Sequence, residues 1–187
     1  MSDLRMHDLL VQRGAIREGH FLLSSGRHSD VYVEKARVFE DPDLTVRLGR
    51  EIASWYENVD VVVSPAVGAL PLGFATALGA PARFIYAERE RGRMTLRRGF
   101  SLSPGERALV VEDVITTGGS AAEVWELVGE SDAERLGVAA LVDRSGAELP
   151  FPLRAVVRIV ARSFGTPDCP LCADGLPVES PGSRQLA

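Results

Sequence analysis

The chain has 187 residues, of which 45% are hydrophobic and 25% charged, and its formal net charge is -5. This length suits one well-buried domain and is short for two. The negative charge argues against nucleic acid or an anionic membrane as the main partner, and no stretch approaches the ~20 apolar residues that span a bilayer. The N-terminus lacks the apolar run of a signal peptide. Together with only two cysteines, these features predict a cytoplasmic protein with reduced thiols.

The first third of the chain predicts a helix, two strands and a second helix. An amphipathic pattern indicates a helix over residues 3–13. Two short strands follow at 21–25 and 30–35, on either side of a polar turn. Asp41 and the proline after it form a typical cap and first turn, which predict a helix running to about residue 58.

The rest of the chain alternates strands with helices. Apolar, β-branched runs predict strands at 59–64, 82–88, 106–113, 135–143 and 154–160, and helices at about 69–78 and 119–130. Alternation at this spacing implies an α/β fold with a doubly wound, mainly parallel sheet. In such sheets ligands bind beyond the carboxyl ends of the strands.

A glycine-rich turn follows one of these strands and leads into a helix. It reads Glu112-Asp113-Val114-Ile115-Thr116-Thr117-Gly118-Gly119-Ser120. Glycines allow the backbone to approach a ligand closely, and amide N–H groups at a helix N-terminus, with nearby hydroxyls, bind phosphate. The two acids can accept hydrogen bonds from ribose hydroxyls. The segment matches neither a GxxxxGK[ST] loop nor GxGxxG, and the remaining alternative is a glycine-rich turn with two solvated acids.

This segment resembles the signature of type I phosphoribosyltransferases. The resemblance implies a parallel sheet flanked by helices, with a small hood over the active site. It implies one domain over 1–187, in which the hood comprises about 1–40 and a tail of about 161–187, and the core about 41–160. It also implies that Glu112 and Asp113 hold the ribose hydroxyls of phosphoribosyl pyrophosphate and that the loop from Thr116 to Ser120 holds its 5′-phosphate. Val114 and Ile115 are expected to contact the same substrate, and Mg²⁺ is the expected cofactor.

Three further regions resemble orotate phosphoribosyltransferases in particular. The pattern at 19–33, which includes Tyr32, resembles the hood strands that line the orotate pocket. The strand that ends in Arg144 resembles one whose arginine meets orotate, and an arginine fork can bind a carboxylate bidentately. The tail beginning at Cys169 resembles extensions in one branch of these enzymes. The resemblance therefore implies transfer of ribose 5-phosphate to orotate in pyrimidine biosynthesis, with Thr116, Arg144 and Tyr32 contacting orotate.

Two loops depart from the family pattern. The pyrophosphate loop at 64–69 lacks the tyrosine and lysine of many members, so backbone amides are the expected donors. The arginine-rich segment at 88–98 resembles the family's flexible catalytic loop, with Arg89 in place of a lysine and Arg91 or Arg93 at later basic positions. Lys35 is the only lysine in the chain. At the other positions where the family usually has a lysine, arginine is therefore the expected substitute. The resemblance implies a homodimer in which this loop acts on the partner's site; the alternative is a solvated, charged hairpin.

Two rival functions stay open. A purine phosphoribosyltransferase would share the phosphate loop, although the hood pattern argues against it. A non-catalytic regulator that binds phosphoribosyl pyrophosphate as an effector would share the fold, because a fold alone does not determine function. Such regulators usually add a DNA-binding segment or a basic face, whereas the extra length here is an acidic-to-neutral tail.

The two cysteines form a single CPLC group, Cys169 and Cys172. They could be half of a zinc site, but two ligands are too few for a closed tetrahedral site, and no histidine lies nearby in the sequence. We therefore expect buried, reduced thiols and predict no metal-ligating residues in the chain.

Overall fold

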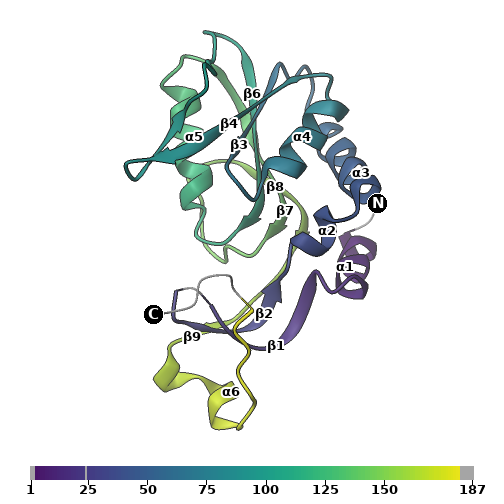
Figure 1. The fold of residues 1–187 in the computed structure, drawn as a ribbon, viewed down its shortest axis with the longest axis vertical. Coiled ribbons are helices and arrows are strands. Elements are labelled where there is room, and N and C mark those ends of the chain that lie inside the picture. Colours follow the sequence, from purple (N-terminus) through teal and green to yellow (C-terminus); the bar gives the residue numbers. More distant parts are fainter. Residues whose placement is uncertain (1–2, 24, 182–187) are drawn as a thin grey trace.

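The computed structural model describes residues 3–23 and 25–181 and contains two sheets (Figure 1). The strands of the larger sheet are β3 (Val61–Pro65), β4 (Arg83–Glu90), β5 (Arg93–Leu96), β6 (Arg107–Ile115), β7 (Glu134–Asp143) and β8 (Leu153–Arg158). Their spatial order is β5-β4-β3-β6-β7-β8, and every pairing is parallel except that of β4 with β5. The prediction of an α/β fold with a mainly parallel sheet is confirmed.

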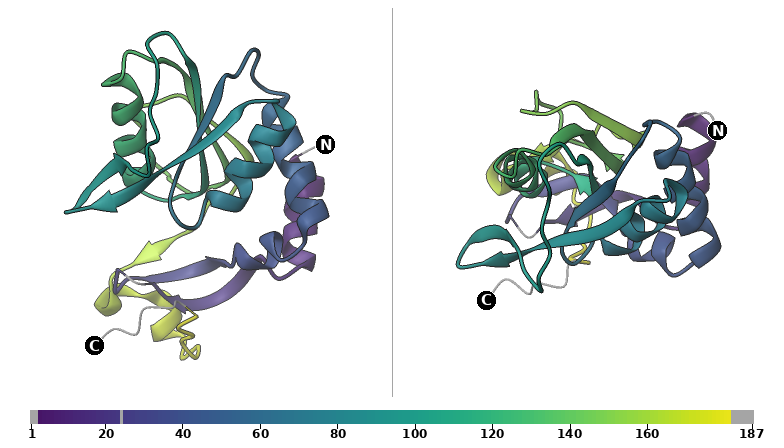
Figure 2. Two further views of the ribbon diagram at one scale, coloured as in Figure 1. Left: turned by 45° about the horizontal axis from the view of Figure 1, so that its top comes forward. Right: turned by 90° about the horizontal axis from the view of Figure 1, so that it is seen from above.

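Helices cover both faces of this sheet (Figure 2). One face carries α3 (Pro42–Ala53) and α4 (Leu70–Gly79), and the other carries α5 (Gly119–Gly129). Successive side chains of a strand point to opposite faces, so Val62 packs with the first pair of helices while Val61 and Val63 pack with α5. Burial on both faces explains the continuous β-branched run at this strand. Among the described residues, no helix has the length and apolarity needed to cross a membrane.

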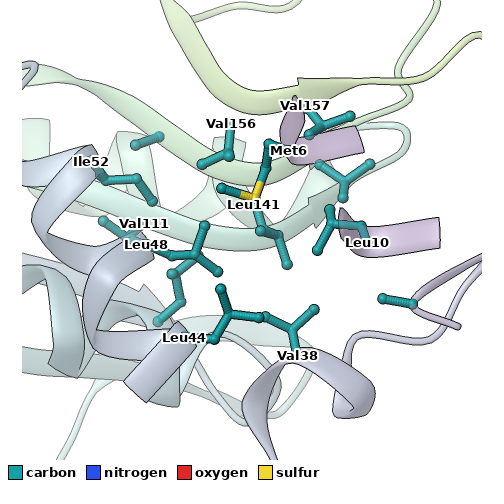
Figure 3. Close-up of a cluster of buried hydrophobic side chains, with 14 of the residues drawn as sticks. Met6, Leu10, Val38, Leu44, Leu48, Ile52, Val111, Leu141, Val156 and Val157 are labelled. Carbon is teal, nitrogen blue, oxygen red and sulfur yellow. The ribbon is translucent and has the colours of Figure 1, made fainter. Parts of the chain in front are cut away.

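The N-terminal helix α1 (Asp3–Gln12) completes the larger apolar cluster. Its Met6 and Leu10 pack with leucines and isoleucine of α3 and with Leu141 of β7, as Figure 3 shows. The short helix α2 (Ala36–Phe39) adds Val38 to the same cluster. Each fully buried aliphatic side chain contributes roughly 1.5–3 kcal/mol, so this cluster attaches the N-terminal segment firmly to the core.

The smaller sheet joins the two ends of the chain below the core (Figure 1). Its strands are β1 (Ile16–Leu22), β2 (His28–Val33) and β9 (Ser163–Phe164), paired antiparallel in the order β1-β2-β9. The tail continues through a 3-10 turn (Thr166–Asp168) and α6 (Pro170–Ala173). It then returns to β1, where Glu179 exchanges backbone hydrogen bonds with His20 and Leu22. Residues 1–2, 24 and 182–187 of the expected hood and tail lie outside the described residues.

Several element bounds differ from the sequence expectation. Strands β1 and β2 begin at Ile16 and His28, earlier than expected, because their pairing extends through polar residues that carry no apolar pattern. Helix α3 ends at Ala53 rather than near residue 58, because beyond Ser54 the backbone hydrogen bonds close tighter turns, from Trp55 to Ile52 and from Tyr56 to Ala53. The cap at Asp41 is confirmed, because its side chain accepts a hydrogen bond from the Leu44 amide at 3.0 Å.

Candidate active site

A polar depression lies at the point where the order of the parallel strands reverses. The chain leaves β3 toward β4 on one side, and leaves β6 toward β7 on the other. The loops after β3 and β6 therefore diverge, which is where open α/β sheets bind ligands. The depression measures about 310 Å³ and is lined by Lys35, Pro65, Ala66, Val67, Gly68, Glu112, Asp113, Val114 and Ser120.

The two acids sit at the base of this depression. Strand β6 is buried along most of its length, and it carries Glu112 and Asp113 to positions that are only 8% and 5% exposed. Asp113 forms an ion pair with Lys35, and its other carboxylate oxygen accepts a hydrogen bond from the Val114 amide at 2.6 Å. Burial, followed by the neighbouring Asp113 charge, raises the pKa of Glu112 to about 8. Glu112 therefore holds its proton more tightly than an ordinary glutamate does.

The raised pKa of Glu112 makes stability depend on pH. In the unfolded chain this group titrates near its ordinary pKa of 4.5, and in the folded protein near about 8. Between these values the folded state binds the extra proton, so this group lowers the free energy of unfolding as pH rises, by up to about 1.4 kcal/mol per pH unit. We expect Glu112→Gln to gain stability relative to the wild type between pH 5 and pH 8, as measured by urea unfolding at several pH values. The exposed Glu57→Gln serves as the control, and a wild-type-minus-variant difference that does not change with pH would contradict the expectation.

Lys35 is a site residue that the sequence analysis did not identify. It follows β2, 78 positions before Asp113, and reaches the acid across the space between the two sheets. The available signal was compositional, because a chain that otherwise uses only arginine keeps one lysine here. A lysine suits this position better than an arginine, because its compact ammonium can contact one carboxylate oxygen of Asp113 without blocking the depression.

Gly68 brings the loop after β3 against this ion pair. A Cβ atom at Gly68 would overlap Asp113 Oδ2 and Lys35 Nζ. The backbone of the expected pyrophosphate loop thus lies in contact with the two charged groups, at a distance that only glycine permits. Amide donors, a carboxylate and an ammonium therefore share one small volume.

The phosphate loop has the conformation that its glycines suggested. Gly118 adopts a left-handed φ of 75°, and a Cβ there would also lie 2.7 Å from Leu149 Cδ2. Helix α5 begins at the next residue, and Thr116, Thr117 and Ser120 are exposed around its N-terminus. The side chain of Ile115 is 1% exposed and packs in the apolar cluster with α5. Its expected contact with the ligand therefore falls to its main chain and stays a prediction.

Arg144 connects the core to the hood. It follows β7 directly, and its guanidinium donates to Ser29 Oγ at 3.2 Å and to the Val31 carbonyl at 3.5 Å. Half-burial lowers the pKa of this guanidinium, although it stays charged. Tyr32 is half-buried, and its ring packs on Phe21 with centroids 5.6 Å apart.

The arginine-rich segment folds as the hairpin of β4 and β5, which projects beside α5 (Figure 1). Arg89 makes two hydrogen bonds to the Glu123 carboxylate of α5, at 2.7 and 3.1 Å, and Glu123 also accepts from the Met94 amide. Arg93, at the start of β5, is exposed. Neither arginine lines the depression with Glu112, so within one chain the structure does not bring them to the site, and their assigned roles stay predictions.

Comparison with known proteins agrees with this geometry. Residues 40–164 match the family model of the phosphoribosyl transferase domain. An orotate phosphoribosyltransferase from Thermotoga petrophila is 46% identical over 183 residues, which cover 96% of this chain and 98% of that protein. One from Caldanaerobacter subterraneus subsp. tengcongensis is 45% identical, with both chains fully covered. The crystal structure of an orotate phosphoribosyltransferase from Aeropyrum pernix has a TM-score of 0.68 and 28% identity, covering 82% of this chain and 93% of that one.

Proposed function

The chain belongs to the phosphoribosyltransferase family, and from that premise we propose that it is an orotate phosphoribosyltransferase. It transfers ribose 5-phosphate from phosphoribosyl pyrophosphate to orotate, giving orotidine 5′-phosphate and pyrophosphate in pyrimidine biosynthesis. The observation that carries this proposal is the position of Arg144, a cation suited to a carboxylate-bearing base, at the junction of hood and core. Identity of about 46% over nearly the full length of relatives named for this activity supports it.

The donor half of the site suits a reaction in which pyrophosphate leaves before the base has fully bonded. The ribose then carries positive charge, and catalysis depends on alignment and charge stabilisation. Glu112 and Asp113 accept hydrogen bonds from the ribose hydroxyls, while the loop from Thr116 to Ser120 holds the 5′-phosphate. Lys35 stands beside the loop after β3, where its ammonium stabilises negative charge on the departing pyrophosphate.

Mg²⁺ is the cofactor that fits this donor set. Two carboxyl groups and the substrate's own oxygens are hard ligands of the kind that Mg²⁺ prefers, and Glu112 and Asp113 are the residues that would hold it with the ribose hydroxyls. When bound, Mg²⁺ neutralises charge on the pyrophosphate. Binding of a cation also favours the ionised form of Glu112, whose pKa is otherwise raised by burial.

The acceptor half lies between the hood and the core. Orotate is placed with its carboxylate against the Arg144 guanidinium and its ring near Thr116, so that its nitrogen faces the ribose. The donors of Arg144 are only loosely held by the hood, at 3.2 and 3.5 Å, which leaves them able to turn toward a carboxylate. Tyr32 is the weakest of the proposed contacts because its ring packs on Phe21.

We propose that the chain is a homodimer in which Arg89 and Arg93 act on the partner's site. Helix α4 exposes Phe74 and Leu78, one turn apart and 54% and 58% accessible, and the exposed Val67 precedes this helix. Apolar side chains gathered in this way mark interaction surfaces. The hairpin that carries Arg89 and Arg93 does not line the depression of its own chain. This position is consistent with arginines that act on the partner's site.

Phe74→Glu is expected to dissociate the dimer. A charge buried at an interface without a partner costs several kcal/mol, so the dimer Kd should rise by about 10²-fold or more. Sedimentation velocity over a concentration series measures this change, and activity should fall together with the dimer fraction. Val11→Glu, at an exposed apolar residue of α1, is the control. A wild type that is monomeric at all concentrations would contradict the proposed dimer.

No nucleic acid or membrane partner is proposed, because the net charge is -5. A cytoplasmic location is proposed because Cys169 and Cys172 do not form a disulfide with each other.

The experiment that tests the proposed function is a spectrophotometric assay with phosphoribosyl pyrophosphate, Mg²⁺ and one base at a time. We expect consumption of orotate and formation of orotidine 5′-phosphate, without turnover of adenine, hypoxanthine or xanthine. Turnover of a purine without orotate would establish the purine rival. Binding of phosphoribosyl pyrophosphate without turnover of any base, accompanied by a gel shift with nucleic acid, would establish the regulator.

A further inference from the structure

Four metal-ligating side chains meet in the hood, outside the site described above. They are His20, His28, Cys169 and Cys172, and one ligand atom from each lies within 4.8 Å of all the others. The histidines belong to the hairpin of β1 and β2. About 150 positions later, Cys169 caps α6 and Cys172 lies within it. In the sequence the CPLC group is only half a site, and the folded chain supplies the missing histidines.

The pairing of the hood strands explains why these residues meet. Leu22 pairs with His28 across the hairpin, and His28 in turn pairs with Phe164 of β9. The chain therefore leaves β9 next to His28 and turns through α6 (Figure 1), whose cysteines contact both histidines. His20, His28 and Cys169 are 4%, 6% and 3% exposed, whereas Cys172 is exposed. A nearly closed cluster with one open corner allows an ion to enter and then be enclosed.

The separations between ligand atoms suit one tetrahedral ion. Cys169 Sγ lies 3.6 Å from His20 Nε2, and Cys172 Sγ lies 3.7 Å from His20 Nε2 and 3.3 Å from His28 Nδ1. Tetrahedral zinc, with bonds of about 2.3 Å to sulfur and about 2.0–2.1 Å to nitrogen, places such atoms about 3.5 Å apart. The two histidine nitrogens are 2.6 Å apart, so the rings must separate by roughly 0.7 Å to reach the same geometry.

A hydrogen bond outside the cluster orients one ligand. His20 Nδ1 lies 2.9 Å from the carbonyl oxygen of Leu176, and a carbonyl can only accept. The Nδ1 atom therefore carries the proton, and the Nε2 lone pair points into the cluster. Such a carbonyl partner is the usual support for a metal-bound histidine.

We propose that these four side chains bind a structural Zn²⁺ ion that fastens the C-terminal tail to the hood hairpin. Two thiolates and two imidazoles favour zinc over the hard cations that carboxylates bind. Four protein ligands leave no open position, so the site is structural. On binding, each thiol loses its proton to solvent and its sulfur forms a bond to the ion, with no redox change.

The ion would stabilise the C-terminal tail, whose secondary-structure elements are short. Strand β9 has two residues and α6 has four, and such short elements cannot bury enough apolar surface to hold their own position. Besides the cluster, the tail is held by the Glu179 backbone bonds and by ion pairs at the surface such as Arg17–Glu179. His28 is also adjacent to Ser29, which Arg144 contacts. The ion thus supports the strand that forms one wall of the proposed base pocket.

Metal analysis of the tag-free protein, purified with reductant and without chelator, tests the proposal. We expect about one zinc ion per chain in the wild type and in His7→Asn, because His7 is the chain's third histidine and lies outside the cluster. Cys172→Ser, at the exposed ligand, and His28→Gln should each bind zinc at least about 10²-fold more weakly in competition with a chromophoric chelator, since they retain only three ligands. Zinc held equally by all four proteins would overturn the proposal.

A second measurement needs no variant and so does not depend on their folding. Wild-type protein stripped of metal and loaded with Co²⁺ should show the visible bands of tetrahedral cobalt and a near-ultraviolet thiolate-to-cobalt band, both abolished by adding Zn²⁺. Chelation should also lower the Tm of the wild type, with recovery on addition of Zn²⁺ alone. Protein that holds no zinc and gives no cobalt bands, or that carries a Cys169–Cys172 disulfide by mass spectrometry after purification under reductant, would overturn the proposal.

Discussion

Replacing Arg144 with alanine is expected to raise the KM for orotate by about 10²-fold or more, while the KM for phosphoribosyl pyrophosphate changes only a few-fold. Truncating one partner of a buried, hydrogen-bonded charge pair costs about 2–5 kcal/mol, and every 1.4 kcal/mol is about tenfold in affinity. Arg144 is half-buried and reaches the hood, whereas the donor residues lie on the loops after β3 and β6. Steady-state kinetics with each substrate varied in turn measures the split.

Two variants make this result specific to the guanidinium. Arg144→Lys keeps the charge but loses the planar fork, and we expect an intermediate KM for orotate. Arg135→Ala removes an arginine from the opposite end of the same strand, where it stacks on Trp125, and should leave the KM for orotate unchanged. If Arg144→Ala and Arg135→Ala gave the same KM for orotate, Arg144 would not be an orotate contact.

The features that the sequence predicted best are those whose cause is local. The β-branched run at Val61–Val63 predicts a strand that is buried on both faces. In the structure these residues belong to β3 and are fully buried. Gly118 predicts a turn into a helix because only glycine readily takes its left-handed φ. The predicted family is confirmed by the match over residues 40–164. The strand run and the Gly118 turn are each contained within about ten residues of chain.

The features that the sequence did not predict depend on contacts between distant segments. Lys35 becomes part of the site only because β2 ends opposite Asp113. The CPLC group lacks metal partners until β9 carries it to His20, about 150 positions away. Conversely, Arg89 resembles a catalytic lysine in sequence but is bound to Glu123 of α5 in the folded chain. Composition and spacing carry no information about such pairings, which are set by strand order.

Gly68→Ala is expected to lower kcat/KM by about 10²-fold with little change in Tm. An added methyl group would overlap the ends of the Lys35 and Asp113 side chains. Both are terminal atoms of side chains that line the depression, so they can move aside without disturbing the apolar core. The fold therefore tolerates the change, but the ion pair and the loop backbone cannot keep their relative positions. A displacement of about 1 Å at a reacting centre is enough for a 10²-fold loss of rate.

The matched control is Gly165→Ala, because a Cβ at Gly165 would meet its nearest atom, Pro167 Cδ, at an ordinary 3.8 Å. Differential scanning fluorimetry and steady-state kinetics on both variants separate stability from catalysis. A large loss of Tm in Gly68→Ala would mean that the loop after β3 supports the fold rather than the substrate. Unchanged kinetics would mean that the contact between this backbone and the Lys35–Asp113 pair is not used. The expected result, lost activity in a stable protein, follows only if the close approach at Gly68 exists to place amide donors beside those two charges.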